Sequence, residues 1–260
     1  MKHQGTVLLT GASGGLGNEF ARLFAKDGYK LVLVALEGDK LKDLAAELER
    51  IYGAKSETIV ADLSQSSAPA MIFEEVARRS IVVDVLVNNA GFGVYGPFVE
   101  TDLNKELSMM HVNMDALTAL TKLFLKGMVE RKYGKILNVA STAAFQPGPL
   151  SAVYFASKGY VLSFTQAIRS ELKGSGISVT TLCPGPTATG FGKRSGMDNS
   201  KLFQRMMKPS VVARQAYEGL MCGKSIVVPG LKNKLLAFSN RLLPRDLAAA
   251  LVRLANGKVK

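Results

Sequence analysis

The sequence predicts an α/β fold in which helices cover both faces of a single, doubly wound parallel sheet of about seven strands. The first observation behind this prediction is that short, almost continuous apolar runs alternate along the chain with longer amphipathic runs. Strands that are apolar along their whole length are typical of parallel sheets, because helices bury both faces of such a sheet. The second observation is a glycine-rich turn directly after the first apolar run, which is typical of a strand, a turn and a helix in succession.

The expected elements follow one another in the order that this fold requires. The strands are the apolar runs at residues 6–10, 30–36, 56–61, 84–87, 135–140, 177–182 and 225–228. The helices are the amphipathic runs between them, at residues 18–26, 39–51, 69–79, about 101–131, 151–173 and 211–221. Because crossovers between parallel strands are right-handed, this alternation gives a Rossmann-type, doubly wound topology.

The length and composition are those of a globular chain with a sizeable core. Of the 260 residues, 47% are apolar and 21% are charged. No apolar run approaches the roughly 20 residues that a membrane-spanning helix needs, and the N-terminus lacks the pattern of a signal peptide. Two cysteines, Cys183 and Cys222, do not make a disulfide framework, and no Cys/His cluster has zinc spacing. We therefore expect a reduced, cytoplasmic protein without a metal site.

The glycine-rich turn at residues 11–17 predicts a dinucleotide site. It joins the expected strand 6–10 to the expected helix 18–26. Glycines permit a tight turn and let the backbone approach a pyrophosphate, while the helix N-terminus supplies free amide donors and a favourable dipole. Further polar residues follow the carboxyl ends of other strands, namely Asp62, residues 88–91, Ser141 and Pro184-Gly185. Ligands of doubly wound sheets bind at this edge, so we expect these residues to converge on one site.

Tyr154 and Lys158 are four residues apart in an expected helix that begins soon after Ser141. This spacing puts both side chains on one helix face, one turn apart. A free phenol has a pKa of about 10, and a neighbouring ammonium lowers that pKa by favouring the phenolate. A tyrosine tuned in this way can pass a proton to or from a carbonyl or alcohol oxygen, which is what hydride transfer with a nicotinamide requires.

Together these motifs resemble those of the classical short-chain dehydrogenases/reductases. The resemblance covers residues 6–189 and rests on Thr10-Gly11-x-x-x-Gly15-x-Gly17, Asn88-Asn89-Ala90-Gly91, Ser141, Tyr154-x-x-x-Lys158 and Pro184-Gly185. It implies an NAD(P)-dependent oxidoreductase that interconverts a ketone or aldehyde and an alcohol. It also implies a homodimer or homotetramer, assembled through the long helices at about 101–131 and 151–173.

The same resemblance implies roles for single residues. Tyr154 would be the acid/base, Ser141 would hydrogen-bond the substrate carbonyl, and Lys158 would lower the Tyr154 pKa and bind the nicotinamide ribose. Asn113 would be the fourth catalytic residue, which supports a proton-relay water. The residues expected to bind the cofactor are Gly11, Ser13, Gly15, Leu16, Gly17, Glu37, Asp62, Leu63, Asn89, Ala90, Gly91, Tyr154, Lys158, Pro184, Gly185, Thr187 and Thr189.

The choice between NAD and NADP depends on residues near the end of the second strand. A 2′-phosphate needs a cation, whereas a free ribose 2′-hydroxyl is held by a carboxylate. Glu37 lies 20 residues beyond Gly17 and would repel a 2′-phosphate, but Lys40 and Lys42 are close to it in the sequence. We therefore expect NAD(H) as the favoured cofactor, with NADP(H) as the alternative.

We expect one domain with two regions. Residues 1–189 would form the dinucleotide-binding and catalytic core, and residues 190–260 a substrate lid, the last strand and basic C-terminal helices. The polar, glycine- and lysine-rich stretch 190–208 would be a mobile lid over the site. Aromatic residues in the expected pocket-forming segments favour an apolar substrate; they are Phe92, Tyr95, Phe145 and Phe191.

Most of the net charge of +12 lies near the C-terminus. Residues 188–260 hold 14 Lys or Arg against three Asp or Glu, which indicates either an anionic partner or a solvated basic surface. The apolar and basic segment 231–252 would either touch an anionic membrane, weakly and through residues 231–260, or pack on the domain or a partner subunit. The sequence contains no basic motif interleaved with aromatic residues, so we do not expect nucleic-acid binding.

One alternative to an enzyme remains open at this point. The same fold can serve as a regulatory protein that binds a dinucleotide without turnover. The set Asn113, Ser141, Tyr154 and Lys158 favours the enzyme, because a pure sensor has no need of a tuned phenol.

Overall fold

The computed structural model describes residues 5–198, 200–240 and 242–257. It contains a seven-stranded sheet in the order β3-β2-β1-β4-β5-β6-β7, and every neighbouring pair is parallel. The strands are β1 (Thr6–Thr10), β2 (Lys30–Ala35), β3 (Ser56–Val60), β4 (Val85–Asn88), β5 (Gly134–Val139), β6 (Ile177–Leu182) and β7 (Ile226–Val227). The predicted doubly wound sheet is confirmed, and its strand order reverses between β1 and β4, where ligands of such sheets bind.

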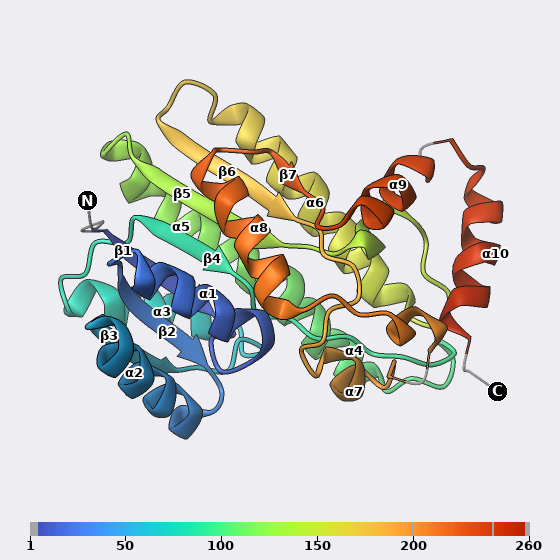
Figure 1. Ribbon diagram of the computed structural model, residues 1–260, viewed down its shortest axis with the longest axis horizontal. Coiled ribbons are helices and arrows are strands. Elements are labelled where there is room, and N and C mark those ends of the chain that lie inside the picture. Colours follow the sequence, from blue (N-terminus) through green and yellow to red (C-terminus); the bar gives the residue numbers. More distant parts are fainter. Residues whose placement is uncertain (1–4, 199, 241, 258–260) are drawn as a thin grey trace.

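Helices cover both faces of the sheet, because successive side chains of each strand point to opposite faces. Val7 and Leu9 of β1 pack with α1 (Gly15–Lys26), α2 (Gly38–Tyr52) and α8 (Pro209–Met221), which lie in front of the sheet in Figure 1. Leu8, between them in the sequence, packs on the other face with α3 (Ala68–Arg78) and α5 (Leu117–Glu130). The long helix α6 (Ala152–Glu171) covers the same face further along the sheet.

The helix expected at about 101–131 is divided into three parts. The parts are α4 (Leu103–Met110), a π-helical turn (His111–Ala116) and α5. The π-helical turn contains Asn113, whose buried side-chain amide is bonded to groups outside the helix. Because π-helical turns are often found at functional sites, this interruption draws attention to Asn113.

The stretch 190–208 is more structured than a polar loop. It contains α7 (Phe191–Ser195) and a 3₁₀ turn (Lys201–Gln204), and Thr187 forms an isolated parallel bridge with Met207. Phe191, Met197 and Phe203 pack in one cluster with Tyr154, so apolar burial orders a segment whose composition is mostly polar. Residue 199 lies outside the described residues.

Two helices complete the described chain, α9 (Leu231–Ser239) and α10 (Arg245–Asn256). Figure 1 shows them in red at one end of the molecule, beyond the last strands of the sheet. Among the described residues, no helix combines the length and the apolar character that crossing a membrane requires.

Candidate active site

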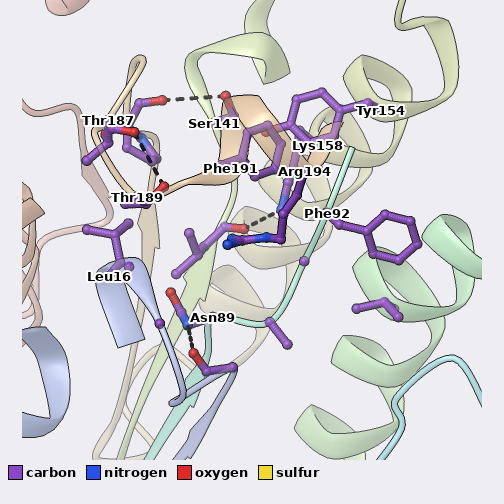
Figure 2. Close-up of a pocket in the computed structure, with 18 of the residues that line it drawn as sticks. Leu16, Asn89, Phe92, Ser141, Tyr154, Lys158, Thr187, Thr189, Phe191 and Arg194 are labelled. Atoms are coloured by element: carbon purple, nitrogen blue, oxygen red, sulfur yellow. Dashed lines mark hydrogen bonds between the residues drawn. The ribbon is translucent and has the colours of Figure 1, made fainter. Parts of the chain in front are cut away.

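A cavity of about 830 Å³ lies at the carboxyl ends of the strands. Its walls include residues directly after β1, β2, β4, β5 and β6, so the sheet topology itself brings the site together. Of the residues predicted from the sequence to be catalytic or to bind the cofactor, all line this cavity except Gly17 and Asn113. Figure 2 shows Ser141, Tyr154 and Lys158 gathered at one end, with Leu16 and Asn89 further along the cavity.

The glycine-rich turn makes a cradle that side chains would fill. Gly11 and Gly15 have φ angles of +64° and +52°, in the left-handed region that favours glycine. A Cβ atom on Gly15 would lie 2.6 Å from the Thr189 Cβ atom, whereas one on Gly14 would meet nothing within 4 Å. Among the described residues no side chain caps the N-terminus of α1, and this N-terminus lies in the cavity wall, so free amide groups lie beside the cavity. This arrangement fits the pyrophosphate of a dinucleotide.

Gly17 has a packing role instead of a place in the cavity wall. A Cβ atom on Gly17 would lie 2.1 Å from the Gly11 carbonyl oxygen, so only glycine lets α1 approach the turn this closely. Asn89 secures the same turn from β4, since its Nδ2 atom donates to the carbonyl oxygens of Thr10 (2.9 Å) and Gly11 (3.1 Å). The Thr10 hydroxyl in turn accepts hydrogen bonds from the backbone amides of Asn89 and Ala90, both 3.0 Å long.

Two carboxylates lie near the end of the cavity opposite Tyr154. Glu37 accepts hydrogen bonds from the Ser13 hydroxyl (2.6 Å) and the Lys40 ammonium (3.2 Å), and the bond from Ser13 is the main cause of its lowered pKa. Asp62 accepts a hydrogen bond from the Ser64 backbone amide (2.9 Å), and its hydrogen bonds with Ser64 lower its pKa. Both groups are therefore carboxylates at neutral pH.

Tyr154 and Ser141 form the hydroxyl pair of the site. Tyr154 is 7% exposed, and burial raises the pKa of its phenol to about 12, although a side-chain hydrogen bond with Ser141 opposes that rise. The Ser141 hydroxyl also accepts a hydrogen bond from the backbone amide of Ala143 (3.1 Å) and contacts the Pro184 carbonyl oxygen at 3.4 Å. Ser141 is thus held in place by backbone groups on two sides.

The net lowering of the Tyr154 pKa that was expected from Lys158 is not found. Burial outweighs the effect of the neighbouring ammonium, so the phenol pKa is raised. The Lys158 Nζ atom donates to the Val139 carbonyl oxygen (2.9 Å) and lies 5.9 Å from the centroid of the Tyr154 ring. Burial also lowers the pKa of Lys158 itself, to about 8, so part of its charge is lost just above neutral pH.

Asn113 lies behind the cavity wall. Its Nδ2 atom donates to the Phe92 carbonyl oxygen (3.0 Å) and the Ser157 hydroxyl (3.1 Å), and its Oδ1 atom accepts from the Phe92 amide (3.2 Å). A Cβ atom on Gly91 would lie 2.9 Å from this Oδ1 atom and 3.3 Å from the Lys158 Nζ atom. Asn113 therefore ties the π-helical turn to the loop after β4 and to α6, close to Lys158.

Hydrogen bonds within the loop after β6 fix its conformation beside the cavity. The Thr187 hydroxyl donates to the Gly185 carbonyl oxygen (2.8 Å), and the Thr189 hydroxyl contacts the Thr187 carbonyl oxygen at 3.3 Å. Thr187 is 8% exposed, so a small polar side chain takes a buried place there and bonds within its own turn.

The aromatic residues expected in the pocket divide into two pairs. Phe92 and Phe191 line the cavity, as predicted. Tyr95 and Phe145 do not, which corrects the prediction: the Tyr95 hydroxyl donates to the Asn256 carbonyl oxygen (2.7 Å), and Phe145 packs in the cluster around α6. Nothing in the sequence separates the two pairs, because all four residues follow the ends of expected strands.

Some residues of the cavity wall lie in segments expected to shape the pocket but were not singled out from the sequence, and Arg194, in the 190–208 segment, is the most notable. Arg194 lies on α7, and within the described residues its guanidinium has no hydrogen-bond or ion-pair partner. The same holds for Gln146 in the segment 145–151 and for Met197 and Phe203 in the segment 190–208, whereas Phe155 and Asn256 were missed altogether. The basic composition of the segment 190–208 was the one sequence feature that could have indicated a cation in the cavity wall.

Comparisons with known proteins show the family to which the chain is similar. The model of the short chain dehydrogenase family matches residues 5–200. The very-long-chain 3-oxoacyl-CoA reductase of Anas platyrhynchos is 34% identical over 195 residues, which are 73% of this chain and 62% of that protein. Ketoacyl reductase HetN of Nostoc sp. is 33% identical over 232 residues, which are 88% of this chain and 76% of that protein.

Solved structures are similar over most of the chain. A short-chain dehydrogenase from Sphingobium yanoikuyae in complex with NADPH has a TM-score of 0.83 and 30% identity, covering 92% of this chain and 93% of that one. The bulky-bulky ketone specific alcohol dehydrogenase from Comamonas testosteroni has a TM-score of 0.79 and 26% identity, covering 93% and 94%.

The extent of the match differs between relatives. The chain spans between about half and three fifths of the length of three very-long-chain 3-oxoacyl-CoA reductases that it matches, at 62%, 61% and 52%. The match to the family model nevertheless covers well over half of the chain and includes the glycine-rich turn, Ser141, Tyr154 and Lys158. The chain belongs to the short-chain dehydrogenase family, a family of NAD(P)-dependent oxidoreductases.

Proposed function

We propose that this protein interconverts a carbonyl compound and an alcohol with a nicotinamide dinucleotide as the hydride carrier and Tyr154 as the acid/base. The observation that carries the proposal is that the hydroxyl pair Ser141 and Tyr154, the Lys158 ammonium and the glycine cradle share one cavity. Those are the parts that carbonyl reduction needs: a proton donor, a group that orients the carbonyl oxygen, and an anchor for the cofactor.

The chain's own residues would manage the proton. When bound, the cofactor supplies or accepts the hydride. The Ser141 hydroxyl orients the substrate oxygen beside Tyr154, which donates its proton to that oxygen in the reducing direction. A phenol with a pKa of about 12 is fully protonated at neutral pH and so is ready as an acid. The Lys158 ammonium, held by the Val139 carbonyl, stabilises the phenolate that proton donation leaves.

The shape and lining of the cavity favour an apolar substrate. Phe92, Phe155, Phe191, Met197 and Phe203 form much of the wall around Tyr154. Two relatives are named as reductases of oxoacyl or ketoacyl groups, and a structural neighbour as an alcohol dehydrogenase specific for bulky-bulky ketones. The substrate class that fits both is a ketone carried on a long apolar chain, such as a 3-oxoacyl thioester.

NAD(H) is the cofactor that the carboxylate near the glycine cradle favours. The ionised Glu37 would accept bonds from a ribose diol and repel a 2′-phosphate. The nearby lysines are already paired with carboxylates, Lys40 with Glu37 (3.2 Å) and Lys42 with Asp39 (3.9 Å). NADP(H) remains the alternative, since a relative 30% identical to this chain is described in complex with NADPH.

The assembly that fits the fold is a homodimer or homotetramer formed through α4, α5 and α6. Exposed apolar side chains lie on these helices, including Leu103 (67% exposed) and Leu107 (43%) on α4 and Tyr160 (40%) on α6. Light scattering coupled to size exclusion tests the proposal: a Leu103→Glu variant would shift the mass toward the monomer, and a monomeric wild type would contradict it.

Tyr154→Phe tests the catalytic proposal directly. We expect kcat for a medium-chain 3-oxoacyl thioester to fall by about 10²–10⁴-fold, the usual contribution of a general acid, with unchanged affinity for NADH. Tyr160→Phe is the matched control, because Tyr160 lies on the same helix outside the cavity and its hydroxyl is hydrogen-bonded to Thr118 (2.8 Å). If wild type binds the dinucleotide tightly but turns over no ketone, the chain is instead the regulatory protein that the fold also permits.

A further inference from the structure

The two C-terminal helices and the residues between them carry an unusual number of exposed apolar side chains. Eight large apolar side chains between residues 231 and 254 are 47–74% exposed. We call them the C-terminal apolar surface; they are Leu231, Leu235, Leu236, Phe238, Leu242, Leu247, Leu251 and Leu254. Single exposed leucines are ordinary on a protein, but a concentrated set of this size indicates a contact surface.

The spacing of these side chains shows that they form stripes. Leu247, Leu251 and Leu254 follow one another at intervals of four and three, which places them along one side of α10. The side of α10 that is buried against the protein carries Ala248, Val252 and Asn256 instead. The leucines thus point away from the domain. A surface helix that packs only on its own domain normally buries its large apolar side chains and exposes polar ones.

Basic side chains accompany the apolar ones. Lys232, Lys234, Arg245 and Arg253 are exposed, and Asp246 is the one exposed acidic residue among described residues 231–257. Within the described part of the chain, none of the four cations takes part in a salt bridge. Exposed leucines together with unpaired lysines and arginines are typical of helices that lie in the plane of an anionic membrane interface.

We propose that α9 and α10 dock this protein onto the surface of an anionic phospholipid membrane. The apolar side chains would enter the boundary between headgroups and acyl chains, and the basic side chains would pair with lipid phosphates. A second copy of the chain fits the surface less well. A two-fold contact brings the same patch of both subunits together, so it would gather the basic residues of both copies in one interface with a single acidic residue from each to offset them.

The position of these helices links the surface to the cavity. The Asn240 amide is hydrogen-bonded to Gln146, and the Asn256 Nδ2 atom donates to the Pro149 carbonyl oxygen (2.8 Å). Gln146 and Asn256 both line the cavity. Docking would therefore bring the cavity wall close to the bilayer, where a long apolar substrate dissolves. That consequence rests on the proposed function, whereas membrane binding itself does not.

Vesicle co-sedimentation tests the proposal with the full-length protein. Vesicles of phosphatidylcholine alone are compared with vesicles that contain added phosphatidylglycerol, at low and at high salt. We expect binding that increases with the phosphatidylglycerol fraction and weakens with salt. The double variant Leu235→Glu/Leu251→Glu should bind at least about tenfold less, because each change removes an exposed leucine that would enter the bilayer and adds an anion. Lys232→Gln/Lys234→Gln/Arg253→Gln should lose the response to phosphatidylglycerol.

Ile51→Glu is the matched control. Ile51 is 50% exposed on α2, which lies at the end of the molecule opposite α10 in Figure 1, so this variant should bind vesicles like wild type. Equal binding by wild type and the leucine variant, or no binding to any vesicle, overturns the proposal. So does a dimer in vesicle-free buffer that the leucine variant dissociates, since a second copy would then cover the surface. Tyr154→Phe should bind vesicles normally, which separates this test from that of the catalytic proposal.

Discussion

The Lys158 ammonium donates a 2.9 Å hydrogen bond to the Val139 carbonyl oxygen and lies 5.9 Å from the centroid of the Tyr154 ring. Both side chains are buried, and burial acts on them in opposite directions, since the charged form of each is disfavoured. With a pKa of about 12, the phenol therefore stays protonated well above neutral pH. With a pKa of about 8, the ammonium begins to lose its proton just above neutral pH. This pair determines how activity and stability should depend on pH.

Carbonyl reduction should become slower as the pH rises through about 8. Above that pH Lys158 becomes neutral and no longer stabilises the phenolate, while Tyr154 is still protonated and able to act as an acid. The measurement is kcat/KM for reduction between pH 6 and 10. Lys158→Met should be slower by about 10²-fold and should lack the inflection near pH 8. An inflection that persists in this variant would assign it to another group.

Lys158 should also make the protein less stable at neutral pH. Its folded-state pKa is lowered from 10.5 to about 8, so between these values the unfolded chain holds a proton that the folded protein lacks. Stability therefore rises with pH across this window, and below it the buried charge destabilises the fold in full. Lys158→Met should raise Tm at pH 7 by about 2–5 °C and flatten this rise. A lower Tm would mean that the bond to Val139 outweighs burial.

Asn113 should be important for stability as well as for the site. Asn113→Ala removes three hydrogen bonds and leaves the Phe92 amide and carbonyl groups without those partners. We expect the free energy of unfolding to fall by about 2–4 kcal/mol, as measured by urea denaturation. Asn104→Ala is the control, since Asn104 is exposed on the neighbouring α4 and should change stability by less than about 0.5 kcal/mol.

Much of the fold and of the site was predictable because both depend on local patterns. The apolar runs specify the strands, and strand ends in a doubly wound sheet share one edge, so Ser141, Tyr154 and Lys158 had to lie near the glycine turn. The π-helical turn at Asn113 was not predictable, because the bonds of its side chain reach Phe92 and Ser157, which are distant in the sequence. Tertiary contacts of this kind override the helix pattern of the surrounding residues.

The structure of the segment 190–208 and the direction of the Tyr154 pKa shift were not predictable for the same reason, because both depend on tertiary packing. Phe191 and Phe203 are isolated aromatics in a polar stretch, and their burial becomes visible only when α7 packs beside Tyr154. The spacing of Tyr154 and Lys158 indicates that the two share a helix face, but it gives neither the depth of burial nor the direction of the ammonium. The direction of the phenol pKa follows from those two features.

Glu37 should control the choice of cofactor. Its carboxylate is bonded to Ser13 and Lys40, and Glu37→Gln removes the charge that would repel a 2′-phosphate while it also frees Lys40. We expect the ratio of the Kd values for NADPH and NADH, measured by nicotinamide fluorescence, to fall by about tenfold or more. Asp39→Gln is the control, because Asp39 is exposed and does not line the cavity. An unchanged ratio would mean that Glu37 does not face the ribose.

Arg194 should hold the pyrophosphate of the dinucleotide. A Cβ atom on Gly190 would lie 3.3 Å from the Arg194 Nη1 atom, so the guanidinium folds back toward the start of α7. The preceding residue, Thr189, lies against Gly15, which begins α1. The unpaired cation and the uncapped helix N-terminus both lie in the cavity wall, so an anion bound between them would gain from both.

Arg194→Gln should weaken the binding of NADH and of ADP-ribose by about tenfold, since one charge-assisted contact to the pyrophosphate is lost. Binding of adenosine, which has no pyrophosphate, should not change. Lys193→Gln is the matched control, because this lysine precedes Arg194 on the same helix and does not line the cavity. Equal loss of affinity for NADH and adenosine would show that Arg194 orders the lid without contacting the phosphates. Unchanged affinity for all three ligands would remove Arg194 from the cofactor site.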